Sequence, residues 1–304
     1  PPPISSPPPP PPTPPPPPPP PSSPPNPPPG GGPPPPPPPP PPPVSITGAR
    51  MTDNAIELHD IEKSFGPVEV LKGVSLTVPP SRCYGLVGDN GAGKSTLLKI
   101  LSGVHPRDAG EILVEGEPVD FNTAIDARLA GIEMIYQDLA LAEDLDAASN
   151  IFLGRERQKG RGPGFKRLDH KRMHAEAAEV LESVGSPLPT KRQVKALSGG
   201  ERQLVAVARA LEFNPRILLM DEPTAALSVE KVTVVNRLIA RLKDRGVSMI
   251  LVSHRFTDLI QVADTIGVLV HGKIVDEFDA ASHSMDDMTT RIVRLMSEAA
   301  VGAA

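Results

Sequence analysis

A glycine-rich octapeptide between an apolar segment and a helical segment constrains this chain more than any other feature. The apolar run Cys83–Val87 predicts a buried strand, and Lys94–Leu101 predicts a helix that ends before Gly103 and Pro106. Between them, residues 88–95 read GDNGAGKS and fit the pattern G-x-x-x-x-G-K-[ST]. Because such a loop needs a strand before it and a helix after it, the sequence predicts an α/β fold built around this turn.

The loop itself predicts a phosphate-binding site. Its glycines allow successive backbone N–H groups to turn toward an anion, and the helix N-terminus adds partial positive charge. Lys94 would reach the β- and γ-phosphates of a nucleotide, and Ser95 would bind Mg²⁺. A glycine-rich turn without a ligand is the alternative, which the flanking strand and helix disfavour. The predicted nucleotide-binding residues are Gly88, Asp89, Asn90, Gly91, Ala92, Gly93, Lys94, Ser95 and Thr96.

Two acidic residues end a second apolar segment. Residues 217–220 are Ile-Leu-Leu-Met, and Asp221 and Glu222 follow them directly. Asp221 would hold Mg²⁺ through water, and Glu222 would polarise an attacking water as general base. For an isolated match, a solvated strand end followed by Pro223 is the simpler explanation. Together with the phosphate loop, the pair of acids favours a catalytic site.

The rest of the chain alternates between strand and helix patterns, which predicts a parallel sheet as the core. An amphipathic helix at 169–184 places Met173, Ala177, Val180 and Leu181 on one face. Further strands are predicted at 55–61, 74–78, 247–252, 266–270 and 273–277, and further helices at 229–243, 256–262 and 285–299.

The first 50 residues differ from the remainder in composition. Residues 1–43 hold 33 of the 43 prolines. Proline fixes φ and donates no backbone hydrogen bond, so this tract is expected to be a disordered tail of solvated polyproline II. A spacer, an SH3/WW-type ligand, or an over-extended gene start before Met51 are the readings left open. The working domain is therefore expected to be residues 51–304.

Charge, cysteine content and hydropathy exclude several classes of protein. The formal net charge of −5 gives no basic footprint for nucleic acid, so no nucleic-acid partner is expected. Cys83 is the single cysteine, which excludes an intrachain disulfide and a cysteine-based zinc site. No run of about 18 apolar residues and no signal-peptide pattern occurs, so a cytoplasmic chain is expected.

A third motif carries a family resemblance. Residues 197–203 read LSGGERQ and open a helix with an apolar stripe at Leu204, Val207, Ala208 and Leu211. Ser198, Gly199 and Gly200 would offer a hydroxyl and N–H groups to an anion at this second helix N-terminus, and Ser198 would also serve as N-cap. The string resembles the signature motif of ABC ATPases, in the family's order between the phosphate loop and the acidic strand end.

The resemblance implies a fold and further site residues. The fold would be a P-loop NTPase ABC cassette, with a RecA-like parallel-sheet core, an antiparallel β subdomain and an α-helical signature subdomain at about residues 138–212. The cofactors would be ATP and Mg²⁺. Gln137 resembles the glutamine that touches Mg²⁺ and couples the site to the membrane subunit, and His254 resembles the switch histidine that contacts the γ-phosphate. Phe65 matches the aromatic residue that stacks on adenine.

The resemblance also implies partners. Two copies would sandwich two ATP molecules, each held by the phosphate loop of one chain and the signature residues of the other. Residues 88–96, 136–139, 150–156 and 224–228 are similar to the ribose/xylose/fructose import subfamily, which implies a homodimer docked to transmembrane permease subunits and served indirectly by an extracytoplasmic sugar-binding protein. The chain would then be peripheral on the cytoplasmic face of the cell membrane.

Two positions depart from the family's pattern. Glu201 stands where the signature commonly ends in Gln, and Ser228 stands where many members have an aspartate at the dimer contact. The alternatives that remain are an ABC ATPase for another solute and a regulatory or soluble ABC-type ATP-binding protein. Members that act on chromosomes have a long heptad insertion, and none is present here.

Overall fold

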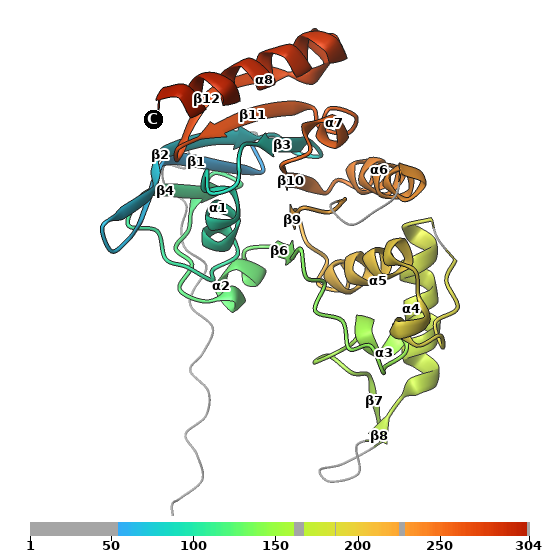
Figure 1. The fold of residues 1–304 in the computed structure, drawn as a ribbon. Coiled ribbons are helices and arrows are strands. Elements are labelled where there is room, and N and C mark those ends of the chain that lie inside the picture. Colours follow the sequence, from blue (N-terminus) through green and yellow to red (C-terminus); the bar gives the residue numbers. More distant parts are fainter. Residues whose placement is uncertain (1–53, 161–166, 186, 225–228, 303–304) are drawn as a thin grey trace, which may run out of the picture. The chain divides into compact units, whose positions relative to one another are not determined.

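The computed structural model describes residues 54–160, 167–185, 187–224 and 229–302. The predicted tail, residues 1–50, and Ser228 lie outside the described residues. Two main sheets organise the described part (Figure 1), a six-stranded sheet of order β12-β11-β3-β10-β9-β6 and a four-stranded sheet of order β2-β1-β4-β5.

The six-stranded sheet is the parallel core that the sequence predicts. Neighbouring strands are parallel from β11 through β6, and only the edge strand β12 is antiparallel. The three central strands are buried at every position, as expected for strands covered on both faces. The strands of this sheet are β3 (Cys83–Val87), β6 (Ile132–Ile135), β9 (Ile217–Asp221), β10 (Ser248–Ser253), β11 (Thr265–Val270) and β12 (Lys273–Asp279).

The antiparallel sheet and helix α1 (Lys94–Leu101) share one hydrophobic core with one face of the parallel sheet. Leu219 and Ile250 contribute from the parallel strands, and Leu97 and Leu101 contribute from α1. The strands of the antiparallel sheet are β1 (Ile56–Phe65), β2 (Val68–Val78), β4 (Ala109–Val114) and β5 (Glu117–Pro118), and the short helix α2 (Ala124–Leu129) precedes β6.

The opposite face of the parallel sheet packs against a second core. Leu218 and Met249, each next in sequence to a residue of the first core, point to this side, because side chains alternate along a strand. Three of the helices that contribute to this core are α6 (Val229–Asp244), α7 (Phe256–Leu259) and α8 (Met285–Gly302). The sequence predicts α7 to Val262, but Val262 N–H bonds to Leu259 O, so the chain leaves the helix in a tighter turn.

A third core belongs to the helices between β6 and β9. It contains α3 (Ala147–Ile151), α4 (His170–Ser183), the short 3₁₀ turn η1 (Val194–Ala196) and α5 (Gly199–Leu211). A small hairpin, β7 (Gln158–Lys159) and β8 (Arg167–Leu168), lies between α3 and α4.

Helix α5 corrects one expectation. The sequence predicts one apolar stripe, but Leu204 and Val207 join the second core while Val205 and Ala208 join the third. The helix is buried on two faces because it stands between the parallel sheet and α3–α4. None of the described helices is long and apolar enough to cross a membrane.

Candidate nucleotide-binding site

The loop from Gly88 to Gly93 lies between β3 and α1, as predicted, and close approaches require glycine at both of its ends. A Cβ at Gly88 would lie 2.3 Å from Leu269 O. Gly93 is the N-cap of α1 with φ 110°, and a Cβ there would lie 2.7 Å from Leu71 Cδ2. No side chain caps this helix. The first turn of α1 is therefore presented through backbone N–H groups, the arrangement that binds phosphate.

Lys94 supplies the positive charge of the loop. Its Nζ donates to Gly88 O at 2.8 Å and to Asp89 O at 2.9 Å, and the residue is 6% exposed. Burial lowers the pKa of Lys94, and the carboxylates of Glu222 and Asp221 oppose that shift. The ammonium group is thus held by carbonyl oxygens that a phosphate would replace as acceptors.

Ser95 and Asp221 meet across the site. Ser95 Oγ donates to Asp221 Oδ1 at 3.3 Å. Burial raises the pKa of Asp221, the hydrogen bond from Ser95 lowers it, and the neighbouring charge of Glu222 raises it further. A hydroxyl and a carboxylate side by side are hard oxygen donors of the kind that Mg²⁺ prefers.

Glu222 is held in an unusual backbone conformation. Its φ is 52°, in the left-handed region that residues other than glycine rarely adopt, and its N–H donates to Val252 O. The carboxylate accepts from the backbone N–H of His254 at 2.9 Å and lies 2.8 Å from His254 Nδ1. Ser253 Oγ donates to its other oxygen at 3.3 Å. Glu222 and His254 are both predicted site residues, and the fold brings them into contact although they are 32 residues apart in the sequence.

These groups converge because they follow the carboxyl ends of parallel strands. The register aligns Val87 with Ser253 and Val252 with Asp221, so the segments after β3, β9 and β10 emerge at one edge. Gln137 follows β6 at the same edge. A pocket of about 320 Å³ results, lined by Val70, Asn90, Gly91, Gly93, Lys94, Ser95, Thr96, Gln137 and Glu222.

Two predicted loop residues face the other side of the loop. Asp89 and Ala92 line a neighbouring pocket against His271, at the turn between β11 and β12. Gly272 N–H donates to Ala92 O there, which fastens that turn to the loop.

Phe65, the predicted adenine contact, lies outside the lining of the phosphate pocket. It is 45% exposed, its ring meets that of His105 edge-on at 5.4 Å between centroids, and Lys63 Nζ lies 5.4 Å from its centroid. Phe65 pairs with Val68 in the β1–β2 hairpin, two residues from Val70, which does line the pocket. An exposed ring beside the phosphate pocket fits the expected stacking role.

The signature residues lie at the start of α5 and do not line the phosphate pocket of the same chain. Ser198 is the N-cap, its hydroxyl accepts from Glu201 N–H, and Glu201 Oε2 accepts from Ser198 N–H at 2.7 Å. Arg192 donates to the other Glu201 oxygen at 2.9 Å. The backbone bond from Ser198 is the main cause that lowers the pKa of Glu201. Gly199 and Gly200 begin the helix behind this capping box.

Sequence reasoning did not find the residues that support Glu222 and His254. Ser253 Oγ also accepts from Arg255 N–H at 3.0 Å, and Thr224 Oγ1 donates to Asp258 Oδ2 at 2.8 Å in a buried pair. This second pair ties the segment after Glu222 to helix α7. A hydroxyl residue directly before His254 was a usable signal for Ser253, whereas Asp258 has no local signature.

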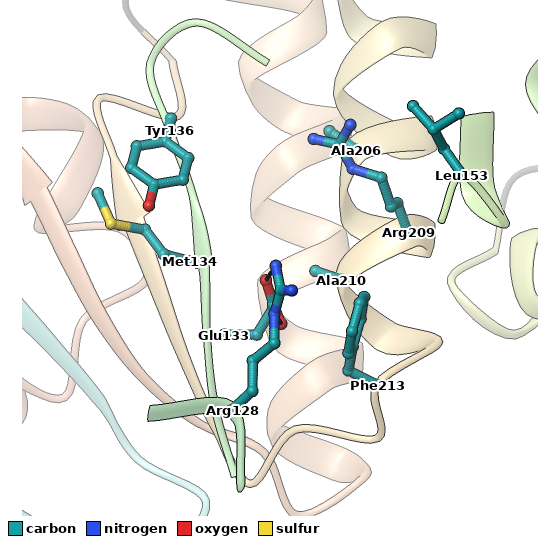
Figure 2. Close-up of a pocket in the computed structure, with 9 residues that line it drawn as sticks. All are labelled: Arg128, Glu133, Met134, Tyr136, Leu153, Ala206, Arg209, Ala210 and Phe213. Carbon is teal, nitrogen blue, oxygen red and sulfur yellow. Dashed lines mark hydrogen bonds and ion pairs between the residues drawn. The ribbon is translucent and has the colours of Figure 1, made fainter. Parts of the chain in front are cut away.

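A groove between β6 and α5 is the second candidate site (Figure 2). It has a volume of about 190 Å³, and Arg128 and Glu133 stand together in it as a bidentate pair at 2.8 and 3.1 Å. Arg128 also lies over the Phe213 ring, 4.4 Å from its centroid. The groove is lined by Arg128, Glu133, Met134, Tyr136, Leu153, Ala206, Arg209, Ala210 and Phe213.

Comparison with known proteins places this geometry in one family. The family profile described as ABC transporter matches residues 71–225. The xylose/arabinose import ATP-binding protein of Sulfolobus acidocaldarius is 44% identical over 235 residues, which cover 77% of this chain and 92% of that protein. A ribose import ATP-binding protein of Streptomyces avermitilis is 39% identical over 78% of this chain, but the match spans only 46% of that relative's length.

Solved structures agree with the fold. An ATP-binding cassette of an ABC transporter in its ADP conformation matches with a TM-score of 0.71 at 23% identity, covering 83% of this chain and all of that chain. A dimeric cassette in a post-hydrolysis state, bound to ADP and Pi, matches with a TM-score of 0.61 at 25% identity, covering 74% and 98%.

Proposed function

Because the chain belongs to the ABC transporter family, we propose that it is the ATP-binding and ATP-hydrolysing subunit of an importer for a sugar of the monosaccharide class. The observation that carries this proposal is the convergence of Lys94, the Ser95–Asp221 pair and the Glu222–His254 pair at one edge of the parallel sheet. The sugar class rests on the relatives, which are a ribose import and a xylose/arabinose import ATP-binding protein.

The donor set of the pocket fits Mg²⁺ bound together with ATP. Ser95 and Asp221 are already adjacent, and Gln137 lines the same pocket. Among the described residues there is no group of three or more His, Cys, Asp or Glu that could hold a metal unaided. Mg²⁺ would therefore be held jointly by protein residues and by the phosphates of the nucleotide. Mg²⁺ would neutralise phosphate charge during transfer.

The chain's own residues would then divide the work. The loop N–H groups and Lys94 hold the phosphates, and His254 places its ring beside the Glu222 carboxylate. Glu222 accepts a proton from the attacking water as general base, which contributes about 10²–10⁴-fold in rate for well-placed groups. Phe65 stacks on adenine.

A second copy would complete each site. Ser198, Gly199 and Gly200 begin α5 away from their own chain's phosphate pocket, so they are available to the nucleotide of a partner. The dimeric relative bound to ADP and Pi supports this arrangement. Closure of two copies over two ATP molecules, followed by reopening after hydrolysis, would be the movement passed to the permease.

The groove of Figure 2 is the proposed docking surface for a permease segment. It begins directly at Tyr136, next to Gln137 of the phosphate pocket, so a segment seated there would sense the nucleotide site. The proposed helical subdomain, residues 138–212, forms its other wall. Leu153 lies at the rim of the groove and is 46% exposed in the single chain, so it offers an apolar side chain to a partner.

Uptake of labelled pentose by cells that carry either the wild-type chain or a variant tests the proposal. Glu222→Gln is expected to abolish uptake of ribose or xylose and to leave uptake of an unrelated solute unchanged. Leu153→Asp is expected to reduce uptake while the purified chain keeps its hydrolysis of ATP. Val275→Asp, which changes an equally exposed residue on β12, is the matched control. Normal pentose uptake with Glu222→Gln would contradict the function.

A further inference from the structure

A patch of positive charge lies at the end of the helical region, although the whole chain carries a formal net charge of −5. Figure 1 shows the β7–β8 hairpin projecting beyond α3 and the start of α4. Exposed basic side chains gather here and form a basic patch. They come from this hairpin, from the segment before it and from the first turn of α4. Its members are Arg155, Lys159, Arg167, Lys171 and Arg172.

The arrangement of the basic patch is electrostatically unfavourable for the isolated chain. Lys159 and Arg167 are directly opposite one another in the antiparallel ladder, where like charges destabilise a strand pair. The first turn of α4 contains Lys171 and Arg172, and the negative charge that a helix N-terminus favours comes from the N-cap Asp169, whose side chain accepts from Arg172 N–H. An anionic surface laid against the patch would relieve the repulsion between Lys159 and Arg167.

The acidic residues nearby neutralise only part of this charge. Arg172 pairs with Glu176 at 2.6 Å, and Lys159 reaches Asp169 only at 3.8 Å. Within the described ranges, neither Arg167 nor Lys171 forms an ion pair or a side-chain hydrogen bond. Arg157 differs, because it is paired with both Glu176 and Glu212 and is structural.

The basic patch adjoins the proposed docking groove. The Arg155 guanidinium lies 3.3 Å from the centroid of Phe213, which lines the groove, and Leu153 lies two residues before Arg155. Leu168, 44% exposed between Arg167 and Asp169, adds an apolar side chain to the hairpin. Basic and apolar side chains together match the interface of a bilayer, where cations meet headgroups and apolar groups enter below them.

We propose that the basic patch binds an anionic lipid surface directly, beside the groove that takes the permease. The ligand chemistry is the phosphate of an acidic headgroup. The contact would orient the cassette on the membrane and add to the affinity supplied by the permease. Its electrostatic part would be screened by salt, since the Debye length is about 8 Å at physiological ionic strength.

Vesicle flotation with the full-length chain tests this inference. Wild-type protein is expected to float with phosphatidylcholine vesicles that contain phosphatidylglycerol, and not with phosphatidylcholine alone. Each basic residue near an anionic surface contributes roughly 5-fold in affinity, so Lys159→Glu with Arg167→Glu is expected to weaken binding by about 25-fold or more. Raising the salt concentration is expected to release the wild-type chain.

The matched control changes the same charge elsewhere. Lys72→Glu with Lys273→Glu alters two exposed lysines on β2 and β12 and is expected to keep nearly all vesicle binding. Equal loss in both double variants, equal binding to neutral vesicles, or no binding of wild type to anionic vesicles at low salt would overturn the inference. The patch variant is expected to hydrolyse ATP at the wild-type rate. Failure of the lipid-binding inference can therefore be distinguished from failure of the proposed function.

Discussion

The N-termini of helices α1 and α5 both contain glycine and serine residues, but they are capped in different ways. At α1 the N-cap is Gly93, which offers no side-chain acceptor, and a buried lysine follows it. At α5, Ser198 and Glu201 form a capping box, and Arg192 pairs with the Glu201 carboxylate. The α1 end is therefore open to an anion in a single chain, whereas at the α5 end the N–H groups of Ser198 and Glu201 are already bonded within the chain.

This difference indicates an order of events. ATP would bind first to the loop before α1, where backbone N–H groups and Lys94 are arranged for phosphate. The α5 end of a second chain would engage later and would exchange part of its internal capping for contacts with the nucleotide. The α1 end would then determine the affinity for ATP, and the α5 end of the second chain would increase the rate of hydrolysis. The following substitutions separate the two ends.

Removing the charge at the α1 end is expected to have the largest effect. Lys94→Ala deletes the ammonium group that faces the phosphates, and kcat/KM is expected to fall by about 10³-fold, the upper range for loss of one electrostatic contact. Phosphate release and calorimetric titration with ATP measure it. Lys99→Ala, in the same helix, is the control and should keep normal kinetics. Unchanged ATP affinity with Lys94→Ala would show that the α1 end does not determine the affinity for ATP.

Glu222→Gln is expected to stop the chemical step while it leaves both helix ends intact. Turnover is expected to fall by about 10²-fold, because the amide cannot accept a proton from water. ATP still binds at α1 and α5 still engages, so an ATP-bound dimer should accumulate in size-exclusion chromatography. Hydrolysis at the wild-type rate would contradict the assignment of Glu222.

Ser198→Ala alters the α5 end alone. Turnover is expected to fall by about 10-fold with unchanged ATP affinity of the single chain, because one charge-assisted hydrogen bond contributes roughly 1.5 kcal/mol or more. Loss of the N-cap also lowers the free energy of unfolding by about 1 kcal/mol. Thr123→Ala removes the N-cap of a similar capping box at α2 and should reproduce the loss of stability without the loss of turnover. Equal turnover losses in the two variants would point to stability alone.

Glu201→Gln is expected to have the smallest effect. The amide can keep the capping hydrogen bond but removes negative charge from the α5 end, so ATP-dependent dimerisation should strengthen by about 2- to 5-fold. The pKa of Glu201 is lowered in the folded chain, so its stabilisation is present above the unfolded pKa and is lost as pH falls through the folded value. Denaturant unfolding across acidic pH should show this dependence in wild type and its reduction in Glu201→Gln; identical profiles would refute it.

The predictable parts of the molecule are those encoded by neighbouring residues. The bounds of α1 and the loop before it follow from glycine, lysine and the flanking apolar runs. The third core and the two buried faces of α5 were not predictable, since they depend on which helices surround it. Likewise, the contact of His254 with Glu222 arises from the order of parallel strands, which joins β9 and β10 although local sequence says nothing of that pairing.

If each site needs the α1 end of one chain and the α5 end of another, Mg²⁺-dependent ATP hydrolysis must depend on protein concentration, and that dependence can be measured. Activity per chain is expected to fall on dilution and to rise to a plateau with increasing protein, while ATP binding to the single chain stays unchanged. Activity per chain that stays constant down to concentrations where only monomer is present would contradict it.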